Sequence, residues 1–225
     1  MPSTNMILPR RTLVSPSLIS IQVGVPRVVK SDVLEAETGI IKLPVNHRVR
    51  LRELNLDGDQ QADLSVHGGQ NKAVYAYPSE HYPFWKKELP GVDFPWGALG
   101  ENFTTSGLLE SSVCLGDRFE IGTAEVVVTQ PRIPCFKLNL KFNRHDMIKR
   151  FLASHRSGFY LRVLREGDVG AGDEIRLIEQ DENGVSVADA LRLYVGESDS
   201  RELLKRALRV KYLSPSWREE LSGQI

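Results

Sequence analysis

The segment QPRIPCFKL, residues 130–138, holds one thiol in a rigid and positively charged stretch of chain. Its two prolines fix φ and favour extended backbone at the residue before each of them, so Cys135 is expected at a defined position. Arg132 and Lys137 flank the thiol. Nearby cations favour the thiolate, the form that attacks electrophiles or binds a soft metal. We therefore interpret Cys135 as a functional thiol.

The second cysteine, Cys114, lies in the segment SVCLGD without a proline brace or a neighbouring cation. A lone cysteine is most often a small buried apolar residue, and we interpret Cys114 in this way. Two cysteines in 225 residues do not form the dense pattern of a secreted disulfide framework. Both thiols are expected to be reduced.

A glycine turn in the segment VHGGQNKAVYAYP, residues 66–78, is a candidate anion-binding element. Gly68 and Gly69 allow backbone amides to approach an anion closely, His67 precedes them, and Lys72 adds a positive charge. The alternative is a glycine hairpin with a structural histidine.

The segment GENFTT, residues 100–105, is a weaker candidate for ligand binding. Asn102 and Thr105 supply uncharged hydrogen-bonding groups. The five histidines of the chain are scattered, whereas a zinc site needs three or four ligands, typically at short spacing. The sequence therefore shows no metal site built from protein ligands alone.

The overall charge excludes several classes of partner. Lys plus Arg (29) equals Asp plus Glu (29), so no bulk positive field attracts a nucleic acid. No apolar run approaches the roughly 20 residues that span a bilayer. We predict a soluble cytoplasmic protein that binds neither nucleic acid nor membrane. Residues 1–17 lack acidic side chains and are interpreted as an N-terminal arm rather than a transit peptide.

The candidate site residues are expected to be positioned by short segments in which apolar and polar residues alternate. The alternation and the frequent turn residues between segments favour a mainly β protein whose antiparallel sheet closes into a barrel. The predicted strands are 18–24, 39–45, 48–54, 73–78, 118–122, 124–130, 158–167 and 173–179.

Helical periodicity appears in two places within the strand-rich region and dominates the end of the chain. Residues 79–89, with a possible kink at Pro83, and residues 144–155 are predicted helices. Further helices are expected to begin after Ser186, after Asp199 or Ser200, and after Ser214. We expect this three-helix unit to dock on the barrel as a small cap, or alternatively to bind a partner protein.

Four segments taken together resemble the MOSC domain family, most closely its bacterial YiiM type. The resemblance covers residues 18–180, and residues 185–225 resemble the small three-helix domain that follows the MOSC domain in YiiM proteins. HGG, GEN and PRxPC in this order are much more specific than any one of them. The segments are TGIIKLPV (38–45), LDGDQQADLSVHGGQNKAVYAYPSEHYPFW (56–85), LGENFTTSGLLESSVCLGDRFEIG (99–122) and QPRIPCFKL (130–138).

The resemblance implies a β-barrel that binds the molybdenum cofactor, with Cys135 as the sulfur ligand of molybdenum. A single thiolate is sufficient because the pterin of the cofactor supplies further sulfur ligands. His67 is a candidate acid by residue type. The candidates for holding the pterin and its phosphate are Lys42, Gly68, Gly69, Lys72, Asn102, Thr105 and Arg132.

Members of the family reduce N-hydroxylated compounds, and the YiiM type is associated with detoxifying base analogues such as 6-hydroxylaminopurine. The electrons come from a separate flavoprotein reductase. The chain fits this division because its sequence contains no flavin or nicotinamide fingerprint and no cysteine cluster for an iron–sulfur centre.

Two other functions stay open at this level. Cys135 could be the nucleophile of a hydrolase or transferase with His67 or His145 as its base. Alternatively, the protein could carry the cofactor or its sulfur without reducing any compound. The three-helix unit alone does not specify a DNA-binding helix-turn-helix.

Overall fold

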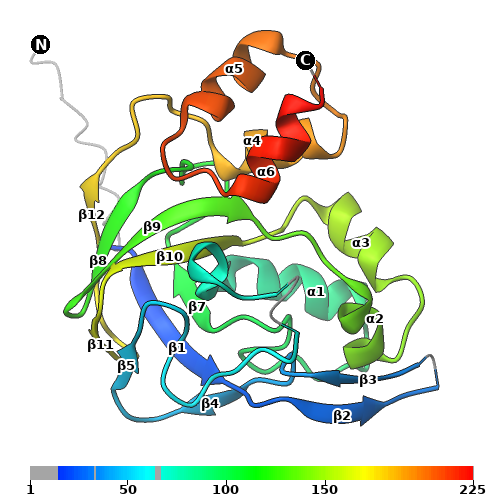
Figure 1. Cartoon of the computed structure of the whole chain (residues 1–225). Coiled ribbons are helices and arrows are strands. Elements are labelled where there is room, and N and C mark those ends of the chain that lie inside the picture. The colour runs from blue at the N-terminus through cyan, green and yellow to red at the C-terminus, as the bar shows by residue number, and fades with distance from the viewer. Residues whose placement is uncertain (1–14, 33, 64–66, 225) are drawn as a thin grey trace, which may run out of the picture.

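The computed structural model describes residues 15–32, 34–63 and 67–224 (Figure 1). The predicted N-terminal arm, residues 1–17, lies almost entirely outside these ranges. The described chain is mainly β, with six α-helices and two short 3₁₀ helices, η1 (Gln70–Lys72) and η2 (Ser79–His81). No helix in these ranges has the length and apolarity that crossing a membrane requires.

One eight-stranded sheet forms the body of the protein, in the order β12-β8-β9-β10-β6-β7-β1-β4. Its ladders are antiparallel except for the parallel pair β6 and β7. In β10 the residues alternate between buried and partly exposed, so one face of that strand packs into the core. The strands are β1 (Ser17–Val23), β4 (Leu43–Val45), β6 (Val74–Pro78), β7 (Phe103–Ser106), β8 (Arg118–Ile121), β9 (Ala124–Pro131), β10 (Phe159–Arg165) and β12 (Ile175–Glu179).

Within the described residues no ladder closes this sheet into the predicted barrel, and β12 and β4 are its edges. The sheet nevertheless curves until the beginning of β1 reaches the turn before β12. Leu18 donates from its amide to the carbonyl of Asp173 at 2.9 Å and accepts from the amide of Gly172 at 2.7 Å. The mainly β prediction is confirmed, whereas the observed sheet is strongly curved and open.

Two short antiparallel strand pairs complete the β structure, and the first of them is a hairpin. They are β2 (Arg27–Lys30) with β3 (Glu35–Thr38), and β5 (Val49–Leu51) with β11 (Gly167–Val169). The sequence did not predict the first pair, because β2 and β3 bury little apolar surface: Val28 is 65% exposed. The predicted strand over 39–45 is reduced to β4.

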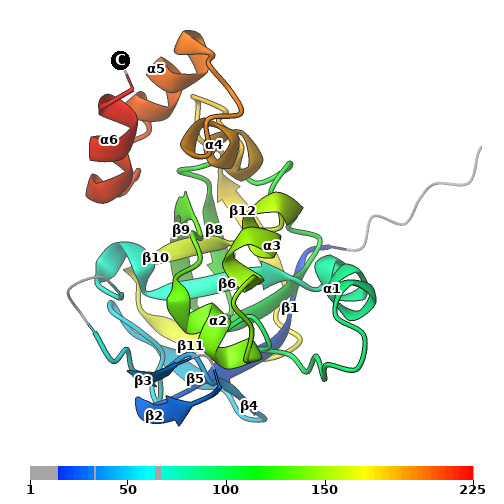
Figure 2. The same cartoon turned by 90° about the vertical axis from the view of Figure 1, so that its right-hand side faces the viewer.

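Three helices pack against the sheet, two of them in front of it and one at the right in Figure 2. They are α1 (Tyr82–Glu88), α2 (Phe136–Phe142) and α3 (Met147–Ser154). Pro83 does not kink a helix but lies in the first turn of α1, where its missing N–H leaves no intrahelical bond unmade. The sequence did not predict α2, which is only seven residues long and follows a proline-rich segment.

The last three helices are α4 (Val187–Tyr194), α5 (Arg201–Arg209) and α6 (Pro215–Ser222). Ser186, Ser200 and Ser214 cap them as predicted, each accepting from an amide in the first turn. Backbone hydrogen bonds tie the start of α4 to the strand-rich body: Val187 donates to Val113 and Ala188 donates to Glu110, both at 2.9 Å. Figure 1 shows these helices, in orange and red, at one end of the sheet.

Candidate functional site

A cleft with about 670 Å³ of open space lies where the loops after β3 and β9 and the loop before β7 meet the glycine turn before η1. Two of the residues predicted from the sequence, Gly69 and Thr105, do not line this cleft. The other seven line it together: Lys42, His67, Gly68, Lys72, Asn102, Arg132 and Cys135.

Cys135 lies between the end of β9 and the beginning of α2. Its backbone is extended, with φ −115° and ψ 175°, and the next residue begins the helix. The Nε2 atom of His67 lies 3.4 Å from the Sγ atom of Cys135. The structure therefore brings the thiol next to an imidazole that is 68 residues away in the sequence.

His67 is half-buried beside cations. Burial, followed by the charges of Lys137 and Lys72, lowers the pKa of its imidazole below the ordinary value of 6.5. The imidazole is therefore mostly neutral at pH 7. Its Nδ1 atom is buried and has no hydrogen-bond partner among the described residues. Such an atom is available to hydrogen-bond a bound ligand or water.

Arg132 is a buried cation, only 5% exposed. Its guanidinium carbon lies 4.9 Å from the ring centre of Tyr75 and 4.9 Å from that of Phe151. Such contacts with aromatic faces stabilise a guanidinium away from water. Its Nη1 atom has no hydrogen-bond partner within the described part of the chain. Arg132 therefore keeps a donor for a ligand.

Four cations line the cleft, and no aspartate or glutamate among the described residues does so. Burial lowers the pKa of Lys72 and, despite the opposing charge of Asp59, that of Lys42. Lys137 is also buried. The chain has no net charge overall, so this local concentration of positive charge favours an anionic ligand.

The amide of Asn102 has a structural role that the sequence did not indicate. Its Nδ2 atom donates to Asp59 at 2.9 Å and to the carbonyl of Gln22 at 3.2 Å, so both amide hydrogens are used. Its Oδ1 atom accepts from the amide of Tyr75 at 3.1 Å. The buried carboxylate of Asp59 also pairs with Lys42. Asn102 and Lys42 therefore brace the cleft wall.

Sequence reasoning missed two buried groups that hold the walls of the cleft. Glu101 accepts hydrogen bonds from the amides of Gly97 and Leu99, at 2.9 and 3.0 Å, and so shapes the loop before β7. Lys141 donates to the carbonyls of Ile40 and Gly97, at 3.1 and 2.6 Å. Burial lowers the pKa of Lys141 to about 8. The sequence signal that could have identified Glu101 and Lys141 is a charged residue within a short apolar segment.

The alternative base considered from the sequence, His145, is exposed and does not line the cleft. Within the described residues His67 is the histidine that does. A cysteine–histidine contact in a cationic, carboxylate-free cleft can bind an anion, hold a soft metal through sulfur, or activate a nucleophile.

Comparison with known proteins places this geometry in a family. The sequence matches the MOSC domain over residues 63–176 and the YiiM-like, 3-alpha helix domain over residues 185–225. The protein YflK of Bacillus subtilis (strain 168), named as uncharacterized, is 42% identical over 202 residues, which are 90% of this chain and 91% of that protein. Protein YiiM of Escherichia coli (strain K12) is 36% identical over 195 residues, 84% of this chain and 87% of that protein.

Two further proteins extend the comparison. A protein of Gibberella moniliformis (strain M3125 / FGSC 7600) named "Reductase" is 37% identical over 150 residues, which are 65% of this chain but 27% of that protein. The crystal structure of YiiM from Geobacillus stearothermophilus has a TM-score of 0.78 and 37% sequence identity, and the match covers 93% of this chain and 98% of that one. The chain therefore belongs to the MOSC domain family and has the YiiM-like three-helix domain at residues 185–225.

Proposed function

We propose that the protein binds the molybdenum cofactor in this cleft and reduces N-hydroxylated compounds such as 6-hydroxylaminopurine. One observation carries the proposal: a single thiol stands in a cleft with four lining cations and, among the described residues, no lining carboxylate. MOSC domains are associated with molybdenum cofactor binding in general. The relative named "Reductase" supports reduction as the class of reaction.

The residues of the cleft fit this cofactor. Cys135 offers one soft sulfur ligand for molybdenum. Arg132 has a buried Nη1 atom with no partner among the described residues and would bind the anionic phosphate with Lys72 and Lys137. The turn at Gly68, with φ +94°, exposes backbone close to the cleft. Lys42 and Asn102 would act on the pterin indirectly, since they already bind Asp59.

When bound, the molybdenum centre supplies two-electron chemistry that removes an oxygen atom from the substrate. The protein's part is to orient the reactants and manage protons. His67, neutral at pH 7, would donate or accept a hydrogen bond at Nδ1 and would assist protonation of the departing nitrogen. The electrons would come from a separate flavoprotein, because the sequence contains no flavin or nicotinamide fingerprint.

The test is to express the full chain in a host that makes the cofactor. Molybdenum content is then measured together with the reduction of 6-hydroxylaminopurine by an artificial electron donor. We expect stoichiometric molybdenum and turnover that depends on it. Protein that holds molybdenum but reduces no N-hydroxylated compound would instead be a cofactor or sulfur carrier.

A second candidate is a cysteine hydrolase or transferase, which the 3.4 Å contact between His67 and Cys135 favours. Such dyads usually have a third group that orients the histidine, whereas Nδ1 of His67 has no partner among the described residues. Metal-free protein that cleaves an ester or thioester through Cys135 would support this reading.

A further inference from the structure

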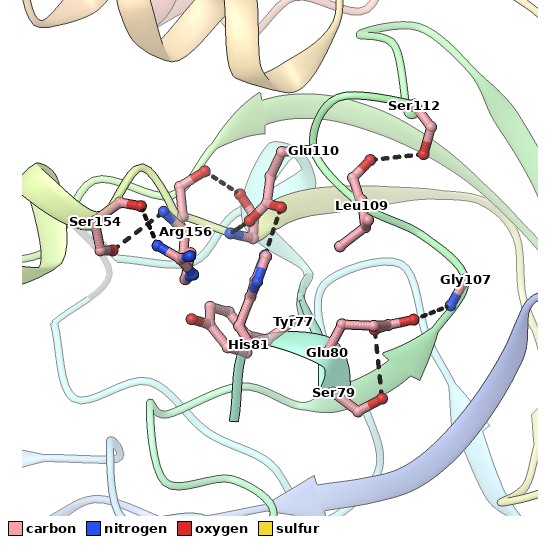
Figure 3. A network of polar contacts seen from close by, with 12 residues as sticks. Tyr77, Ser79, Glu80, His81, Gly107, Leu109, Glu110, Ser112, Ser154 and Arg156 are labelled. Atoms are coloured by element: carbon pink, nitrogen blue, oxygen red, sulfur yellow. Dashed lines mark hydrogen bonds and ion pairs between the residues drawn. The ribbon is translucent and has the colours of Figure 1, made fainter. Parts of the chain in front are cut away.

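A buried histidine–glutamate pair lies outside the cleft lining (Figure 3). The Nε2 atom of His81 is 2.7 Å from the Oε2 atom of Glu110, and the two side chains are 13% and 5% exposed. The other carboxylate oxygen, Oε1, accepts from the amide of Gly158 at 2.7 Å. Charge-assisted hydrogen bonds of this kind hold their groups firmly. The pair therefore fixes the turn at residues 157–158.

The turn at 157–158 in turn holds two residues of the cleft wall. The carbonyl of Ser157 accepts from the hydroxyl of Tyr75 at 2.8 Å, and the carbonyl of Gly158 accepts from the amide of Arg132 at 3.3 Å. Gly158 has φ +59°, and a Cβ atom there would lie 2.4 Å from the carbonyl oxygen of Ala76. This turn therefore has little freedom to move without moving Tyr75 and Arg132.

A second route of contacts leads from His81 to the same guanidinium. The rings of His81 and Tyr77 are 5.5 Å apart, and the hydroxyl of Tyr77 accepts from the indole of Trp85 at 2.6 Å. Trp85 stacks on Phe151 at 6.0 Å, and Phe151 supports one face of Arg132. Both routes end at the buried cation of the cleft.

We propose that His81 and Glu110 are positioning residues, which set the place of the Arg132 guanidinium and the Tyr75 ring through the turn at 157–158. The identity of the ligand that Arg132 binds rests on the proposed function. The positions of Arg132 and Tyr75 do not depend on it. The carbonyl of Glu110 also accepts from the amide of Ala188 in the first turn of α4, so the three-helix domain is linked to the histidine–glutamate pair.

The test reads the electric field at Cys135 in the full chain without bound cofactor. The protein is alkylated with iodoacetate, which is anionic, or with iodoacetamide, which is neutral. Mass spectrometry of the Cys135 peptide then gives the rate for each reagent. The ratio of the two rates reports the nearby positive charge and cancels changes in thiolate fraction and in accessibility. Arg132→Gln calibrates the method and is expected to lower the ratio about three- to tenfold.

We expect His81→Ala and Glu110→Ala to lower the same ratio at least about twofold, because the guanidinium shifts relative to the thiol. His81→Gln keeps an N–H donor for Glu110 and is expected to restore the ratio. The matched control is His155→Asn, which removes an exposed histidine–glutamate contact of 3.4 Å with Glu197 and suits the left-handed backbone of residue 155, with φ +55°.

Once Arg132→Gln has shown that the ratio responds to the guanidinium, wild-type ratios in folded His81→Ala and Glu110→Ala proteins would overturn the inference. Glu110→Ala is replaced by Glu110→Gln, which keeps an acceptor for the Gly158 amide, if the alanine variant does not fold. In that case the ratio measured for His81→Ala decides the inference. The proposed function fails by a different measurement, since molybdenum content and turnover play no part in this ratio.

Discussion

The two cysteines of this chain are similarly exposed but have opposite surroundings. Cys114 lies near carboxylates: burial, and then the charge of Asp117, raises the pKa of its thiol to about 11. Cys135 lies 3.4 Å from His67 in a cleft lined by cations. The two thiols therefore differ in the sign of the neighbouring charges and not in accessibility.

Replacing each thiol by a hydroxyl is the sharpest test of this difference. We expect Cys135→Ser to lose molybdenum and the reduction of 6-hydroxylaminopurine together, because serine offers no soft sulfur ligand. Cys114→Ser is the matched control and should keep both. Metal content and turnover are measured on the same preparations. Normal turnover by Cys135→Ser would remove the proposed function.

A second substitution tests the cations that line the cleft beside Cys135. Arg132→Gln removes the buried cation whose Nη1 atom has no partner among the described residues, so we expect activity and cofactor retention to fall about 10- to 100-fold. The control is Arg156→Gln, whose guanidinium lies 3.9 Å from the ring centre of Phe84 and does not line the cleft. Equal losses in both variants, measured as kcat/KM per bound molybdenum, would contradict a specific role for Arg132.

What the sequence predicted about the two thiols was local. The prolines and cations around Cys135 are its chain neighbours, and the structure places this thiol, but not Cys114, in the lining of the cleft. The alternating segments likewise predicted most strands, and three serines located the last helices. Recognition of the HGG, GEN and PRxPC segments in order supplied the family.

What could not be predicted depends on contacts between distant segments. Asn102 meets Asp59 across 43 residues, and that bond gives Asn102 a bracing role instead of direct ligand contact. Lys141 supports two loops by donating to backbone carbonyls, those of Ile40 and Gly97. A pattern of side chains in the sequence does not indicate where such carbonyls lie. Helix α2 was missed because two turns of helix leave too little periodicity to detect.

The pH dependence of alkylation sharpens the comparison for Cys114. Because its pKa is raised to about 11, only about one hundredth of the thiol is ionised at pH 9, two units below that value. We expect its rate with iodoacetamide to rise about tenfold per pH unit between pH 8 and 10. The measurement compares the Cys114 peptide of the folded chain with that of urea-unfolded protein. A plateau near pH 9 in the folded chain would contradict the raised pKa.

The smallest expected effect concerns the imidazole that accompanies Cys135. Burial and the charges of Lys137 and Lys72 lower the pKa of His67, so its titration by NMR should have a midpoint below 6.5. Below pH 6.5 the unfolded chain then binds more protons at this site than the folded chain. The stability that the neutral imidazole contributes is therefore complete above pH 6.5 and decreases as the pH falls through that value toward the lowered pKa.

Lys137→Gln removes one of the charges that lower this pKa, so the midpoint of His67 should move up toward 6.5 in that variant. The matched control is Lys149→Gln, which removes an exposed charge that does not line the cleft. A midpoint above 6.5 in the wild-type chain would contradict the lowered pKa, and one above 7 would mean that His67 is mostly a cation at neutral pH. The thiol of Cys135 would then face an imidazolium, which is the arrangement of a cysteine nucleophile rather than of a neutral proton carrier beside a metal ligand.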